Sequence, residues 1–177
     1  LAHFRAVIDH AGAPVMLYDV PGRTGTEISL PVYEALADDD RVIAVKDAVG
    51  DLPRAAKLAQ LGYAVYSGDD IRTLGFLAHG GCGLVSVVGH AAGPQLAGMI
   101  NDFLGGDHAK ALATYQQLLP AFEAVMGVPN YGATTAKAAL QLAGVLDNRR
   151  VRLPLVELTD AEVDALRAGL VAAGLIG

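Results

Sequence analysis

The chain has 177 residues, of which 53% are hydrophobic, and its net charge of −6 and pI near 5.2 argue against nucleic acid or an acidic membrane surface as a partner. Its single cysteine, Cys82, excludes an intramolecular disulfide and a metal cluster held by cysteines alone, and it fits the reducing cytoplasm. The most apolar stretch, residues 83–93, is short and broken by polar residues and glycines, so we expect no membrane-spanning segment.

Strand-like and helix-like patterns alternate over the first 106 residues. Short apolar runs rich in β-branched residues predict strands, the third with its turn, at residues 14–20, 41–48, 63–70 and 83–89. Apolar residues at helical spacing predict helices at residues 1–11, 30–40, 53–62, 71–81 and 94–104. Strands joined by helices must run parallel, so this part is predicted to be an α/β sheet covered by helices.

Only helical patterns follow, at residues 109–126, 133–145 and 160–174. The sequence therefore predicts two domains, an α/β part over residues 1–106 and an all-helical part over residues 107–177.

Four strands of this kind fit either an open doubly wound sheet or half of a (β/α)₈ barrel, which needs roughly 250 residues. An open sheet normally has a glycine-rich phosphate loop after its first strand, and neither G-x-G-x-x-G nor G-x-x-x-x-G-K-[ST] occurs. The chain also opens without Met in a helical pattern, which we interpret as a cut. Half of a barrel is the favoured interpretation.

Lys46 lies near the end of the second predicted strand, where βα folds place reactive side chains. A period of two puts it between Ala44 and Ala48 on one face, and we expect Ile43 and Val45 to pack against helices on the other. Desolvation disfavours an ammonium, and a neutral amine is the nucleophile that forms a Schiff base with a carbonyl. The alternative is a surface lysine paired with a following aspartate.

Tyr18 lies at the end of the first predicted strand, so it can share the mouth of the barrel with Lys46. A phenol can exchange a proton with a carbinolamine oxygen, although an ordinary half-buried tyrosine bonded to a backbone carbonyl is the alternative. Arg23 follows the Pro21-Gly22 bend, where a guanidinium can grip a carboxylate or simply remain solvated.

The stretch S-G-D-D at residues 67–70 ends the third strand. Gly68 allows the backbone to approach a ligand, and Asp69 or Asp70 can cap the next helix. No histidine or further acid stands at matching spacing, so no metal site is predicted here.

Four blocks together resemble a known family: Y-D-V-P-G-R-T-G at 18–25, V-K-D-A-V-G-D at 45–51, Y-S-G-D-D at 66–70 and G-L-V-S-V at 83–87. Their content and spacing resemble the second half of the dihydrodipicolinate synthase family, which belongs with N-acetylneuraminate lyase among the pyruvate-dependent class I aldolases. The resemblance runs through nearly the whole chain. It implies a (β/α)₈ TIM barrel followed by a helical domain, usually a homotetramer, with residues 1–106 as the second half of the barrel.

The resemblance implies a lyase that condenses pyruvate with aspartate-4-semialdehyde, towards diaminopimelate and lysine. By resemblance, Lys46 forms the Schiff base, Tyr18 relays protons, and Arg23 holds the carboxylate of the semialdehyde. Gly68 and Val85 would line the pyruvate pocket, one through its backbone and the other through its side chain. No metal or organic cofactor is implied, because the protonated imine is the electron sink.

Arg23 in the P-G-R-T-G turn favours the synthase over the sialic acid lyase branch. The alternatives are another pyruvate-dependent aldolase, such as an N-acetylneuraminate lyase-like enzyme, and a non-catalytic keto-acid-binding relative. The family's front half, with its pyruvate-binding threonine loop, has no counterpart here. We therefore expect a truncated chain with unpaired strand edges, whose activity alone is doubtful.

Overall fold

The computed structural model describes all 177 residues, and these divide into two compact units, Leu1–Val85 and Ser86–Gly177. This division follows contacts between backbone segments and groups residues 89–104 with the helices that follow them. The predicted division at residues 106 and 107 follows the last βα repeat of the sequence pattern instead, and it stays a prediction.

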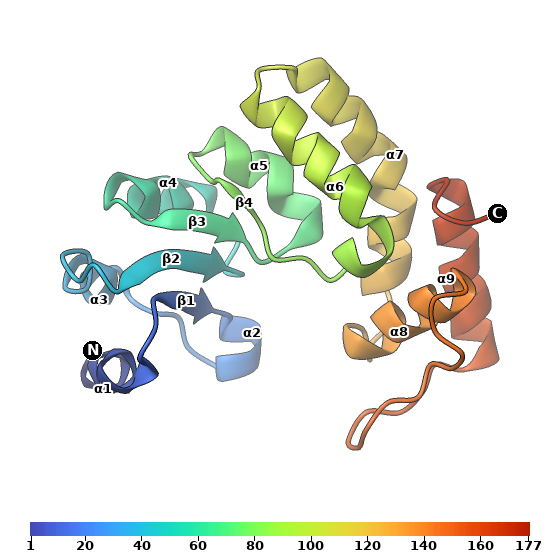
Figure 1. Ribbon diagram of the computed structural model, residues 1–177, viewed down its shortest axis with the longest axis horizontal. Helices are drawn as coiled ribbons and strands as arrows, with labels where there is room; N and C mark the ends of the chain where they lie inside the picture. Colours follow the sequence, from blue (N-terminus) through green and yellow to red (C-terminus); the bar gives the residue numbers. More distant parts are fainter. The chain divides into compact units, whose positions relative to one another are not determined.

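The first unit is a four-stranded parallel sheet in the order β1-β2-β3-β4, with each strand joined to the next through helix (Figure 1). The strands are β1 (Val15–Asp19), β2 (Val42–Asp47), β3 (Ala64–Ser67) and β4 (Gly83–Leu84). The helices are α1 (Ala2–Ala11), α2 (Pro21–Thr24), α3 (Leu30–Glu34), α4 (Leu52–Gln60) and α5 (Thr73–Ala78), with a 3₁₀ turn η1 (Asp70–Arg72) before α5. The predicted α/β class, with four parallel strands, is confirmed.

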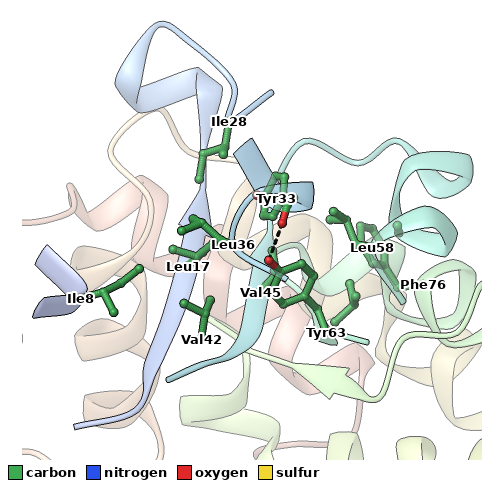
Figure 2. Packing of buried hydrophobic residues seen from close by; sticks show 12 residues of the cluster. Ile8, Leu17, Ile28, Tyr33, Leu36, Val42, Val45, Leu58, Tyr63 and Phe76 are labelled. Atoms are coloured by element: carbon green, nitrogen blue, oxygen red, sulfur yellow. Dashed lines mark hydrogen bonds between the residues drawn. The ribbon is translucent and has the colours of Figure 1, made fainter. Parts of the chain in front are cut away.

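The core of this unit lies between one face of the sheet and its helices. Leu17, Val45 and Val65 come from three successive strands, and all three are buried against α3, α4 and α5. Tyr33 and Phe76 from those helices are fully buried as well (Figure 2). The Tyr63 hydroxyl donates to the Tyr33 carbonyl at 2.7 Å, which satisfies a polar group inside this core.

A register shift in β1–β2 corrects the predicted faces of β2. Val15 pairs with Val42 and Met16 pairs with Ala44, which leaves Ile43 as an extra residue between them. Ile43 is therefore 54% exposed and does not pack against a helix, whereas Val42 joins Val45 in the core. A strict period of two cannot anticipate this, because a bulge changes which face the residues on either side of it occupy.

The fourth strand is shorter than predicted, because pairing with β3 ends at Leu84. One further bond, from the Val85 amide to the Ser67 carbonyl, continues the direction of the strand at 2.9 Å. Val85 therefore lies just beyond β4.

The second unit consists of α6 (Gly89–Leu104), α7 (His108–Met126), α8 (Ala133–Leu142) and α9 (Asp160–Ala172). α7 packs against both α6 and α9 (Figure 1). α6 begins before the predicted start at Pro94, but its backbone is non-helical at Ala92, so the turn before Pro94 is a separate piece. No helix of either unit combines the length and apolar character needed to cross a bilayer.

Gly169 lets α9 approach α7 closely. A Cβ atom at this position would lie 2.4 Å from the Ala124 Cβ and 2.7 Å from the Pro120 carbonyl oxygen. Backbone atoms cannot yield as a flexible side chain does, so the absence of a side chain at Gly169 sets the spacing of these two helices.

We expect Gly169→Ala to lower the free energy of unfolding by about 1–3 kcal/mol, because the added methyl group overpacks this contact. Gly98 in α6 is the matched control, since a Cβ there meets nothing within 4 Å. Gly98→Ala should stabilise by roughly 0.5–1 kcal/mol through its helix propensity. Urea unfolding of both variants measures the difference, and equal effects would contradict the role given to Gly169.

Candidate functional site at the ends of β1 and β2

Tyr18 and Lys46 lie side by side on the sheet face opposite the core. They are paired residues in the parallel register of β1 and β2, and Lys46 Nζ lies 4.1 Å from the centroid of the Tyr18 ring. Lys46 is half-buried, and its ammonium group makes no ion pair with the aspartates that follow it in sequence. A phenol and an amine are therefore neighbours at the carboxyl end of the sheet.

Arg23 lies on α2, the single helical turn that follows β1 (Figure 1). Its amide and that of Thr24 donate to the Val20 carbonyl, and the turn ends at Gly25, whose φ of 73° is left-handed. The Arg23 side chain is exposed, and its guanidinium makes no hydrogen bond or ion pair within the chain. A short, well-bonded turn thus presents a free guanidinium.

Gly68 and Val85 follow the ends of β3 and β4. The Gly68 amide donates to the Asp47 carbonyl at 2.7 Å, and a Cβ on Gly68 would lie 2.8 Å from the Ala48 Cβ. Gly68 therefore lets the chain after β3 pass close to the residues after Lys46. Val85 is 36% exposed.

Tyr66 did not stand out in the sequence, yet the register of β2 and β3 pairs it with Lys46. Lys46 consequently stands between Tyr18 on one strand and Tyr66 on the other. The Tyr66 ring lies against Gly83, where a Cβ would be 2.7 Å from the ring. Its alternation with the buried Val65 was visible in the sequence, but the pairing of strands was not.

A hollow of about 400 Å³ lies beside β1, and of the five predicted site residues only Tyr18 lines it. Its other walls come mainly from α1, from the end of α2 and from the loop that follows α2, including Phe4, Thr24 and Ile28.

A buried ionic cluster occupies the opposite face of the same two strand ends, and we call it the Arg54 cluster, consisting of Arg54, Asp19, Asp47 and Tyr33. Arg54 Nη2 lies 2.5 Å from Asp19 Oδ2, and Nη1 lies 2.7 Å from Asp47 Oδ2. Asp19 Oδ2 also accepts from the Tyr33 hydroxyl at 3.2 Å and from the Ile28 amide at 3.1 Å. Both carboxylates are almost completely buried.

One guanidinium thus pairs with two buried carboxylates, and burial and neighbouring charges change the pKa values of groups in this cluster. Burial raises the pKa of Asp47, although the amides of Val49 and Gly50 and the charge of Arg54 act in the other direction. Burial and the charge of Asp19 raise the pKa of Tyr33 well above its usual value. The second oxygen of Asp19, Oδ1, is buried without a hydrogen-bond partner.

The acids of the S-G-D-D stretch have other partners. Asp69 forms an ion pair of 3.3 Å with Arg72. Asp70 is buried, and its backbone carbonyl accepts from the Thr73 hydroxyl. No three His, Cys, Asp or Glu side chains of the structure are placed to hold a metal ion together.

Comparison with known proteins shows the family. The family model described as the dihydrodipicolinate synthetase family matches residues 1–173. The chain belongs to this family.

Several relatives carry the same likeness. A 4-hydroxy-tetrahydrodipicolinate synthase of Acidothermus cellulolyticus is 49% identical over 175 residues, which are 98% of this chain and 56% of that protein. The crystal structure of the Cyanidioschyzon merolae dihydrodipicolinate synthase with lysine bound has a TM-score of 0.91 at 36% identity. The chloride-inhibited Acinetobacter baumannii synthase complexed with pyruvate has a TM-score of 0.90 at 30% identity. Each structure covers 99% of this chain, and the chain covers 60% of each.

The chain therefore spans a little more than half the length of the dihydrodipicolinate synthases that it matches. The likeness to their structures over nearly the whole chain confirms the expected fold, part of a (β/α)₈ barrel followed by helices.

The raised pKa of Asp47 predicts a pH dependence of stability in this member of the dihydrodipicolinate synthetase family. Above about pH 4, the usual value of this carboxyl, the unfolded chain releases the proton that the folded chain still holds, which favours unfolding. The contribution of Asp47 to stability is thus fully present below pH 4 and is lost as the pH rises through the folded value. Asp47→Asn removes this dependence.

We expect the stability of the unsubstituted protein, minus that of Asp47→Asn, to fall as the pH rises above about 4, because burial raises the pKa of Asp47. Urea unfolding of both proteins across this range measures the difference. A difference that grows with pH would mean that Arg54 lowers the pKa of Asp47 more than burial raises it.

Proposed function

We propose that this chain carries the Schiff-base half of a 4-hydroxy-tetrahydrodipicolinate synthase, a class I aldolase-type lyase that condenses pyruvate with aspartate-4-semialdehyde. The observation that carries the proposal is the placement of Lys46 beside Tyr18 at the carboxyl end of the sheet, with no carboxylate paired to the amine. The relatives named 4-hydroxy-tetrahydrodipicolinate synthase support the same reaction.

In this mechanism the Lys46 amine attacks the ketone carbon of pyruvate, and water leaves to give an imine. The protonated imine withdraws electrons from the neighbouring methyl group, which loses a proton and becomes an enamine. The enamine carbon attacks the aldehyde, whose oxygen takes up a proton. The amino group of the new chain then displaces Lys46 and closes the ring. No metal or organic cofactor takes part, because the imine itself accepts the electrons.

Tyr18 is proposed to carry protons to and from the carbinolamine oxygen during imine formation. Its ring contact with Lys46 supports this role, because a general acid must lie within reach of the reacting atoms. Gly68 and Val85 are proposed to line the pyruvate pocket, since both follow the carboxyl ends of neighbouring strands.

Arg23 is proposed to bind the carboxylate of aspartate-4-semialdehyde. Its guanidinium is exposed and unpaired on a turn that Gly25 and the Val20 carbonyl hold in shape. An exposed and unpaired guanidinium on a fixed turn can form two parallel hydrogen bonds with a carboxylate.

The whole enzyme is proposed to act as a homo-oligomer in the cytoplasm, where the free thiol of Cys82 stays reduced. A tetramer is the expected assembly. The chain spans little more than half of its relatives, so the experiments below use the full-length protein.

We expect pyruvate with borohydride to leave a covalent adduct on Lys46, because reduction makes the imine permanent. Peptide mapping by mass spectrometry locates it. Lys46→Arg should abolish the adduct, and Lys57→Arg, an exposed lysine of α4, should leave it unchanged. An adduct elsewhere, or none, would refute the Schiff-base role of Lys46.

We expect Arg23→Ala to reduce kcat/KM for aspartate-4-semialdehyde by about 10- to 100-fold, the effect of losing one charge-assisted contact. Imine trapping with pyruvate should stay within about twofold, since the exposed Arg23 guanidinium forms no hydrogen bond or ion pair with Lys46 or Tyr18. Steady-state kinetics and the trapping assay give the two numbers. Equal loss of both would contradict carboxylate binding, and preference for a polyhydroxylated aldehyde would favour the sialic acid lyase branch.

A further inference from the structure

We propose that Arg54 is a positioning residue for the reaction: its guanidinium fixes Tyr18 and Lys46 relative to each other by holding the carboxylates of the residues that follow them. The inference rests on the proposed function for its catalytic consequence. The geometric part, a clamp across two strand ends, can be tested without any substrate.

The clamp joins neighbouring strands at one level of the sheet. Asp19 follows Tyr18 and Asp47 follows Lys46, and the register pairs Tyr18 with Lys46 and Asp19 with Asp47. The side chains of successive residues in a strand point to opposite faces, so the Tyr18–Lys46 pair and the Asp19–Asp47 pair lie on opposite faces of the sheet. Arg54 reaches both carboxylates from α4, at 2.5 Å and 2.7 Å.

Arg54 also ties in the segments that follow the strands. Nη2 donates to the Ile28 carbonyl at 2.9 Å, in the loop after α2. Asp47 Oδ1 accepts from the Val49 amide at 2.8 Å, and the Ala48 amide donates to the Asp19 carbonyl at 2.9 Å. The ends of β1 and β2 and the first residues beyond them therefore form one bonded unit.

The shape of the guanidinium matters as much as its charge. Its planar fork presents separate N–H groups to two acceptors at once, whereas an ammonium is a single point of charge on a flexible stem. Arg54 is mostly buried, with 11% of its side chain exposed, and no other cation reaches Asp19 or Asp47. A lysine at this position would keep the charge and lose the fixed spacing.

Small displacements are costly for the proposed chemistry. A shift on the order of 1 Å in a reacting group can slow a reaction about 100-fold. The Lys46 and Tyr18 side chains interact through the contact of Nζ with the tyrosine ring, which does not fix their spacing. The backbone beneath them must supply it.

The test compares Arg54→Lys with Arg41→Lys in the full-length protein. Arg41 is a matched control, because it also bridges two carboxylates, Asp39 and Asp9, at 2.7 Å and 2.9 Å, but it precedes β2 at the opposite end of the strand. Two quantities are measured: the rate of pyruvate adduct formation at Lys46 under borohydride, per folded molecule, and hydrogen exchange at the Ala48 and Gly68 amides.

We expect Arg54→Lys to form the adduct at least about tenfold more slowly and to exchange both amides faster, and Arg41→Lys to change neither. Arg54→Met should slow adduct formation as much as Arg54→Lys does, and it should unfold at a lower temperature than Arg54→Lys. Circular dichroism establishes which variants are folded, and if neither Arg54 variant folds, Asp19→Asn replaces them with the same expectation, because it weakens only one arm of the clamp.

If Arg54→Lys has the same stability and the same rate of adduct formation as the unsubstituted protein, the proposal is overturned, since charge alone would then suffice. Equal effects of Arg54→Lys and Arg41→Lys would overturn it as well. If the unsubstituted protein forms no adduct at Lys46, the proposed function fails, and the exchange of the two amides alone decides whether Arg54 clamps the strand ends.

Discussion

Parallel pairing of β1 with β2 determines how the phenol, the amine and the two buried carboxylates lie relative to one another. The register places Tyr18 beside Lys46 and, one residue on, Asp19 beside Asp47. Side chains alternate along a strand, so the phenol and the amine share one face while the two carboxylates share the other. A slip of one residue in this pairing would exchange the faces of one strand and separate the amine from the phenol.

Charged groups are paired on one face of the sheet and the Lys46 amine lies beside an aromatic ring on the other, which bears on the reactivity of Lys46. The acids closest in sequence to Lys46 are Asp47 and Asp51, yet Asp47 is paired with Arg54 and Asp51 caps α4 through the Arg54 amide. Neither carboxylate pairs with the Lys46 amine, whose Nζ lies 4.1 Å from the centroid of the Tyr18 ring. The Arg54 cluster thus holds the strands together on one face, while the amine on the other face has no carboxylate partner.

The sequence was sufficient for the alternation of strands and helices and for the strand-end positions of Tyr18 and Lys46, because both follow from local periodicity. It failed where tertiary pairing overrides that periodicity. The bulge at Ile43 exposed a residue expected in the core, and α6 gained a turn before Pro94. Arg54 gave no signal of its own, although two aspartates in core-facing positions at strand ends imply a buried cation, since buried carboxylates require partners.

Arg23 and Arg54 show why residue type alone could not separate binding from positioning. Both are arginines near the carboxyl ends of the first two strands, and both suit a carboxylate. The Arg54 guanidinium is already bonded to two buried carboxylates and a carbonyl, so its charge is balanced inside the protein. The Arg23 guanidinium is exposed and free, on a turn whose backbone is fixed. Of these two arginines, Arg23 is the one whose guanidinium is free to bind an external acid, whereas Arg54 is bonded to the carboxylates of the residues that follow Tyr18 and Lys46.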